Sequence, residues 1–143
     1  MGNHKSITES YLKYKEGTLS LYDGLLTNAD SQSSIILIEA LKEIEAGHKK
    51  DILTHQEIKT PNINIALSDA LSLTPTDEFR SLSRIFDTIL ALKEKSFESY
   101  SDEIKKIHGK QIEHLPIIQS IKTAESHILH LLKSEKRKCM LDH

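Results

Sequence analysis

The sequence predicts an all-α protein: an antiparallel four-helix bundle made of two helical hairpins joined by a long crossover. The chain of 143 residues has only 5 glycines, 3 prolines and 5% aromatic residues, a composition that favours helices over sheets. Apolar residues recur every three or four positions along four long segments, as on the buried face of a helix. The outer two connections are short and the middle one is long, which is typical of paired antiparallel helices.

The first hairpin is expected to contain helices over residues 6–27 and 32–58. Asn28–Ser31 forms the turn between them and supplies capping side chains for the second helix. In that second helix one face combines apolar and polar residues at helical spacing. The residues of this face are Ile38, Leu41, Glu45, His48 and Ile52.

Residues 59–74 are predicted to be the crossover, because Pro61 and its polar neighbours interrupt the helical pattern. The third helix is expected over 75–108, with Thr74 as its N-cap, Pro75 at its first position and Gly109 as its stop. The fourth helix is expected over 115–134, and we predict that it frays in residues 134–143. All 143 residues then form one domain.

Composition excludes several classes of function. With 38% hydrophobic residues, 28% charged residues and a net charge of -2, the sequence predicts a soluble domain that binds no nucleic acid. The one basic run, Lys133–Lys138, is typical of a solvated helix end. No apolar run approaches the roughly 20 residues that span a membrane, and the N-terminus lacks the apolar stretch of a secretory signal. The single cysteine, Cys139, is consistent with a reducing cytoplasm.

Glu45 and His48 are the first candidates for chemistry. They lie one turn apart on the face that the second helix turns inward. A Glu-x-x-His unit facing a bundle interior is a recurring ligand pair for metal ions. The alternative is that both are polar residues at the edge of the core, hydrogen-bonded to a neighbouring helix.

The two halves of the sequence resemble each other. Residues 15–22 and 93–100 both read Lys-Glu-x-(Thr/Ser)-apolar-x-x-Tyr. In the second helix of each hairpin, Ile44–His48 is parallel to Thr123–His127, so each half is predicted to end in a core-facing histidine. This alignment places Ala124 opposite Glu45 and His127 opposite His48.

In these features the chain resembles the rubrerythrin branch of the ferritin-like superfamily, over roughly residues 6–133. The resemblance implies a bundle that holds two iron ions and reduces peroxides or oxidises ferrous iron, in a cytoplasmic homo-oligomer, with a dimer favoured. Many members carry a rubredoxin domain with Cys-x-x-Cys pairs. We expect a domain without that module, since the chain ends at Cys139–His143.

The resemblance also exposes an incomplete metal site. Glu45, His48 and His127 match family ligands, but the expected carboxylate before His127 is Ala124, with Glu125 beside it. The family's other two glutamates lie seven residues before a tyrosine, and here those positions hold Lys15 and Lys93. Positions seven apart are nearly eclipsed at about 100° per residue, so both lysines share the inward face with their tyrosines.

Two arrangements remain open. A π-bulge would rotate the helices by one residue and turn Glu16 and Glu94 inward. Iron or another divalent metal would then be held, with Glu125 or water completing the shell, by Glu16, Glu45, His48, Glu94 and His127. Without a bulge, the lysines either pair with Glu45 or extend toward the bundle end.

Two functions follow from these arrangements. The first is a metal-dependent oxidoreductase of the ferroxidase or peroxidase type. The second is a metal-free bundle that acts by protein interaction or self-association. Two buried lysines add about +2 to a site meant for cations, and unpaired buried charge costs several kcal/mol. The lysines therefore favour the second function over di-iron chemistry.

Overall fold

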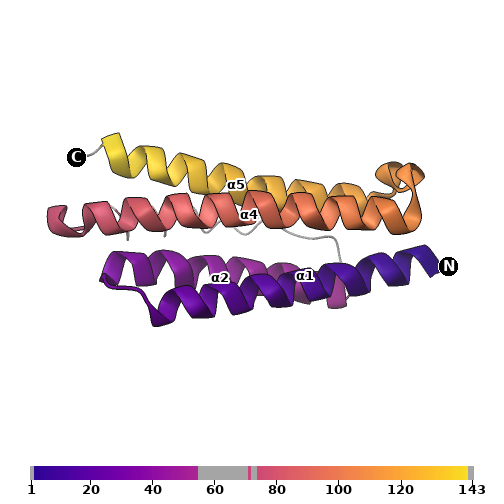
Figure 1. Cartoon of the computed structure of the whole chain (residues 1–143), viewed down its shortest axis with the longest axis horizontal. Coiled ribbons are helices and arrows are strands. Elements are labelled where there is room, and N and C mark those ends of the chain that lie inside the picture. Colours follow the sequence, from indigo (N-terminus) through magenta and orange to yellow (C-terminus); the bar gives the residue numbers. More distant parts are fainter. Residues whose placement is uncertain (1, 55–70, 72–73, 142–143) are drawn as a thin grey trace.

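Four long helices contain most of the residues that the structure describes (Figure 1). The structure, a computed structural model, describes residues 2–54, 71 and 74–141, and the side chains of 7–139 within those ranges. The elements are α1 (Gly2–Thr27), α2 (Gln32–Leu53), the 3₁₀ turn η1 (Thr76–Glu78), α4 (Phe79–His108), the 3₁₀ turn η2 (Lys110–His114) and α5 (Pro116–Leu141). The predicted all-α four-helix bundle is confirmed.

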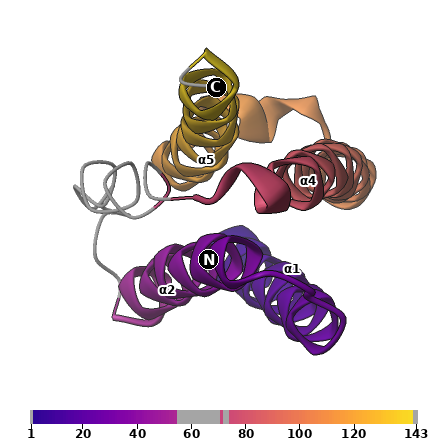
Figure 2. The ribbon, with the colours of Figure 1, turned by 90° about the vertical axis from the view of Figure 1, so that its left-hand side faces the viewer.

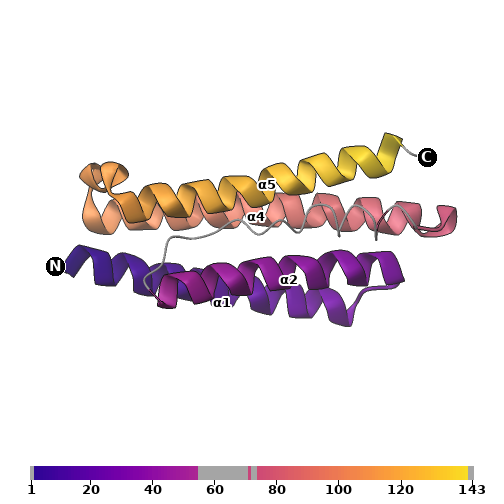
Figure 3. The ribbon, with the colours of Figure 1, turned by 180° about the vertical axis from the view of Figure 1, so that it is seen from behind.

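The helices pack as two antiparallel hairpins. Figures 1 and 3 show α1 beside α2 in one layer and α4 beside α5 in the other, and the end-on view in Figure 2 places α1 beneath α4. α1 and α5 run in one direction, and α2 and α4 run in the other. The N- and C-terminal ends of the chain consequently lie at opposite ends of the bundle. None of the described helices combines the length and apolar character that crossing a bilayer requires.

Two of the predicted helix ends are confirmed. The Ser31 side chain caps α2 by accepting a hydrogen bond from the backbone N–H of Ser34 at 3.2 Å. Gly109 ends α4 with a φ of 83°, and its N–H donates to the Lys105 carbonyl. Glycine adopts this left-handed conformation without the strain that a side chain would add.

The predicted start of the third helix is wrong in detail. The backbone of Pro75 is extended, with a ψ of 148°, so the chain turns first through η1 and α4 begins at Phe79. Thr74 does not act as an N-cap, because its hydroxyl donates to the Leu71 carbonyl at 2.6 Å. The second helix ends earlier than predicted, because α2 stops at Leu53 and the backbone N–H of Thr54 caps it by donating to the Lys50 carbonyl at 3.0 Å. The predicted end at 58 and most of the predicted crossover, 59–74, lie outside the described residues.

The last helix is longer than predicted. α5 continues to Leu141 instead of fraying after residue 134. Its buried stripe persists through Leu131 and Leu132 to Glu135 and Cys139, all at most 7% exposed. Continued burial of one face stabilises the final turns.

The core has two apolar parts, one toward each end of the bundle. One part includes Tyr22 and Leu41, and the other includes Tyr11 and Ile52. Along α1, Lys15 lies between Tyr11 and Tyr22, and polar residues of α2, α4 and α5 occupy the matching level. The middle of the bundle is therefore polar although it is fully buried.

Candidate functional site

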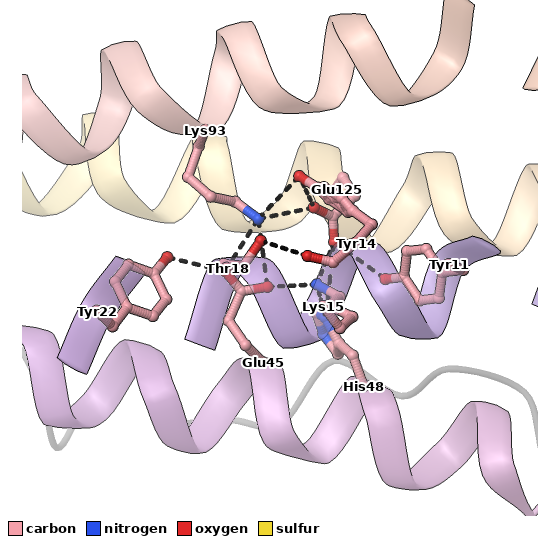
Figure 4. Close-up of polar contacts among 9 residues, drawn as sticks. All are labelled: Tyr11, Tyr14, Lys15, Thr18, Tyr22, Glu45, His48, Lys93 and Glu125. Atoms are coloured by element: carbon pink, nitrogen blue, oxygen red, sulfur yellow. Dashed lines mark hydrogen bonds and ion pairs between the residues drawn. The ribbon is translucent and has the colours of Figure 1, made fainter. Parts of the chain in front are cut away.

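Each of the four long helices described above contributes at least one residue to the buried polar centre (Figure 4). α1 provides Lys15, α2 provides Glu45 and His48, α4 provides Lys93, and α5 provides Glu125. Each is at most 2% exposed. Because charged residues are almost never fully buried unless they are paired, the contacts among these five side chains determine what the site can do. We call these five residues the central cluster.

Lys15 lies in the middle of the central cluster. Its Nζ contacts Oε1 of Glu45, Oε2 of Glu125 at 2.5 Å and Nδ1 of His48 at 3.2 Å. An ammonium group has three N–H donors, and these contacts supply three acceptors. The contact with Lys15 requires Nδ1 of a neutral His48 to be the acceptor. Nε2 of His48 then carries the proton, and it is buried without a hydrogen-bond partner among the described residues.

Lys93 approaches the same two carboxylates from the opposite layer. Its Nζ lies 2.9 Å from Oε2 of Glu45 and 2.8 Å from Oε1 of Glu125. It also donates to the Tyr14 hydroxyl at 3.2 Å and lies 5.1 Å from the centre of that ring. Each ammonium therefore bridges carboxylates from α2 and α5. The prediction that lysines pair with Glu45 is confirmed, and the alternative that they extend toward the bundle end is wrong.

Tyrosines occupy the remaining oxygen positions of the carboxylates. The Tyr22 hydroxyl donates to Glu45 at 2.8 Å, and those of Tyr11 and Tyr14 donate to Glu125 at 3.0 and 2.9 Å. Burial, reinforced by the nearby carboxylates, raises the pKa of all three phenols, so they stay protonated. Both carboxylates are thus fully hydrogen-bonded.

The charges of the central cluster sum to zero. Burial alone would lower the pKa of Lys93, but Glu45 and Glu125 raise it. Burial likewise opposes ionisation of Glu125, but Lys15 and Lys93 lower its pKa. For His48, burial and the ammonium of Lys15 lower the pKa to about 4. Two ammonium groups then face two carboxylates beside a neutral imidazole.

Glu16 and Glu94 lie outside the bundle. Glu16 is 61% exposed and pairs with Lys49 at 3.6 Å, and Glu94 is 51% exposed and pairs with Lys133 at 3.3 Å. α1 and α4 are α-helical throughout, without the π-bulge that would turn these residues inward. The expectation that they serve as inward ligands is therefore wrong, and Lys15 takes the interior position of α1.

The predicted register of the last helix is off by one residue. The buried pattern of 117–132 follows that of 37–52, which makes Glu125 the counterpart of Glu45 and Ile128 the counterpart of His48. His127 is only half-buried, and its Nδ1 has no hydrogen-bond partner among the described residues. It lies off the inward face and does not join the central cluster. When the two halves of the chain were aligned on their histidines, the second half lacked a carboxylate because Ala124 stood in its place. Glu125 supplies that carboxylate in the structure.

A signal for Glu125 was in the sequence. Glu125 follows Ile121 by four residues and precedes Ile128 by three, which is the spacing of Glu45 between Leu41 and His48. Tyr14 gave no such signal. It precedes Lys15 in the chain, and its ring stacks on that of Tyr100 with the two ring centres 5.0 Å apart.

The three potential metal ligands of the central cluster lie close together. Glu45, His48 and Glu125 each offer one ligand atom, and these atoms all lie within 4.8 Å of one another. Two carboxylates and one imidazole at this spacing could hold a metal ion. However, Nζ of Lys15 contacts an atom of each of the same three residues. Two carboxylates and one imidazole, shared with two ammonium groups, do not fit the pair of iron ions that the resemblance implies.

We expect acid to destabilise the fold through His48. Its pKa of about 4 in the folded protein lies below the ordinary 6.5, so the unfolded chain binds the proton first as the pH falls. Stability is then lost between about pH 6.5 and 4, by on the order of 3 kcal/mol. The lowered pKa of Glu125 acts in the same direction at lower pH. Urea denaturation of the wild type and of His48→Gln across this range measures the contribution, and equal pH profiles would contradict it.

The comparisons with known proteins do not assign the chain to a family. Comparison with protein-family models, curated proteins and solved structures finds no match. The central cluster and the helix arrangement are therefore the basis for a functional assignment.

Proposed function

We propose that the chain is a ferritin-like bundle of the rubrerythrin type in which an internal ion-pair network replaces the metal pair. In this proposal the protein is a metal-free scaffold that acts by protein interaction or self-association. The observation that carries it is the position of Lys15, whose ammonium contacts the three residues that a metal would use. The order of the helices and the repeated Lys/Tyr positions support the resemblance.

Charge supports the absence of a di-iron centre. Two ferrous ions bring about +4, which four carboxylates neutralise in a complete site. The central cluster has two buried carboxylates, and Lys15 and Lys93 already neutralise them. A divalent ion added to this balance leaves an excess of +2 in the interior, where unpaired charge costs several kcal/mol.

The same geometry argues against redox catalysis. A catalytic metal needs an open position for its substrate, whereas the oxygens of Glu45 and Glu125 accept hydrogen bonds from lysines and tyrosines. We therefore infer that the central cluster does not act as a metal-dependent ferroxidase or peroxidase centre.

Metal analysis tests this proposal. We expect the protein purified after growth in iron to contain no stoichiometric metal, because Lys15 and Lys93 neutralise the only two carboxylates of the central cluster. We expect the same after anaerobic loading with ferrous iron, with no rise in melting temperature. Iron bound at one or two ions per chain would overturn the proposal.

A second candidate function is the binding of one divalent ion. The observation that favours it is the close, buried grouping of Glu45, His48 and Glu125. Such binding requires the Lys15 side chain to leave its position. If it occurs, a divalent metal raises the melting temperature of the wild type but not that of Glu45→Ala.

Association and location are further parts of the proposal. The resemblance favours a homodimer, and light scattering on the purified chain tests it. A cytoplasmic location accords with the single cysteine, Cys139, which is buried and forms no disulfide within the chain.

A further inference from the structure

The two buried lysines are not equivalent. Lys15 contacts an imidazole as well as two carboxylates. Among the described residues, the hydrogen-bond acceptors of Lys93 are all oxygen atoms, from Glu45, Glu125 and Tyr14. The difference arises because α5 has Ile128 where α2 has His48, so only one half of the internal repeat offers a nitrogen ligand.

Loss of the Lys15 ammonium would leave three ligand atoms around one space. Oε1 of Glu45, Oε2 of Glu125 and Nδ1 of His48 all contact that ammonium, and the last two are 3.9 Å apart. Two carboxylate oxygens and an imidazole nitrogen form a ligand set that suits zinc and cobalt. Loss of the Lys93 ammonium would leave Lys15 among these ligands.

We propose that Lys15 is the residue that excludes a divalent cation from Glu45, His48 and Glu125, and that Lys93 does not have this role. The inference rests on the proposed function, in which the wild-type chain is metal-free. It implies that a chain without the Lys15 ammonium binds one ion of the zinc or cobalt type. The net charge of the cluster sets the order in which the variants are expected to bind a divalent ion, with the more negative cluster binding more tightly. Lys15→Met leaves the cluster at -1 before the metal binds, and Lys15→Met/Lys93→Met leaves it at -2, which a divalent ion neutralises.

Cobalt binding to a set of methionine variants tests the inference, because methionine preserves most of the lysine stem without its charge. The set comprises wild type, Lys15→Met, Lys93→Met, Lys15→Met/Lys93→Met and that double variant with His48→Gln. Titration with Co²⁺ is followed by visible absorption and by melting temperature, with helicity measured by circular dichroism. We expect one ion per chain in Lys15→Met and in the double variant, at least about a hundredfold tighter than in wild type. We expect no such binding in Lys93→Met and weaker binding with His48→Gln.

Three results would overturn the inference: binding by Lys93→Met as tight as by Lys15→Met, unchanged binding with His48→Gln, or no binding in helical Lys15→Met and double variants. The proposed function survives each of these, provided that the wild type stays metal-free. Stoichiometric cobalt in the wild type instead removes the proposed function. If Lys15→Met and the double variant fold only when cobalt is present during refolding, the inference is supported. If both stay unfolded with cobalt, it is overturned.

Discussion

Replacing Glu125 with alanine is expected to lower the free energy of unfolding by about 3–5 kcal/mol. The change leaves Lys15 and Lys93, each at most 2% exposed, facing a single carboxylate. It also removes the acceptor for the buried hydroxyl of Tyr11 and the partly buried hydroxyl of Tyr14, and a buried donor without a partner adds to the cost. Urea denaturation at pH 7.5 measures the loss.

Glu94→Ala is the matched control. It makes the same substitution within a helix, but Glu94 is 51% exposed and its pair with Lys133 lies on the surface. Surface ion pairs contribute about 0–1 kcal/mol, so we expect little change. If Glu125→Ala cost no more than Glu94→Ala, the central cluster would not stabilise the fold.

The second large effect concerns charge balance within the central cluster. We expect Lys93→Met and Glu45→Gln each to cost about 3–5 kcal/mol, because each leaves an uncompensated buried charge. When both substitutions are combined, Lys15 stays paired with Glu125, and the glutamine at position 45 can still accept a hydrogen bond from the Tyr22 hydroxyl. The double variant is therefore expected to lose less than the sum of the single losses, by about 1–3 kcal/mol.

A thermodynamic cycle measures this coupling. The wild type, the two single variants and the double variant are unfolded in urea under one set of conditions. Lys42→Met/Glu45→Gln serves as a control pair, since Lys42 is partly exposed and pairs with Asp23 outside the central cluster. Additive losses in Lys93→Met/Glu45→Gln would contradict a network held by charge balance.

The fold could be predicted from sequence because its signals are local and repeated. Apolar residues at helical spacing determined the four helices, and Gly109 and Ser31 marked two of their ends. The inward position of the lysines was also predictable, since Lys15 and Lys93 each lie two turns before a buried tyrosine. Their pairing with Glu45 was predictable because a buried charge without a partner is costly.

The rest of the site depends on helix rotation, which a single ligand motif does not determine. Aligning the last helix on His127 made Ala124 the inward residue and gave Glu125 only an auxiliary role, as a group that completes the metal shell. The apolar positions Ile121 and Ile128 define the face correctly, because they average over several turns. Contacts of Tyr14 depend on how α1 and α4 cross, and periodicity gives no information about that.

The neutrality of the central cluster also has an evolutionary consequence. A single Lys15→Glu change would place three carboxylates against one ammonium, and a single Glu45→Lys change would do the reverse. Each single change unbalances the buried charge and costs several kcal/mol of unfolding free energy, so we expect changes at these positions to be tolerated best in compensating pairs. In related sequences we accordingly expect positions 15, 45, 93 and 125 to change in compensating pairs of opposite sign.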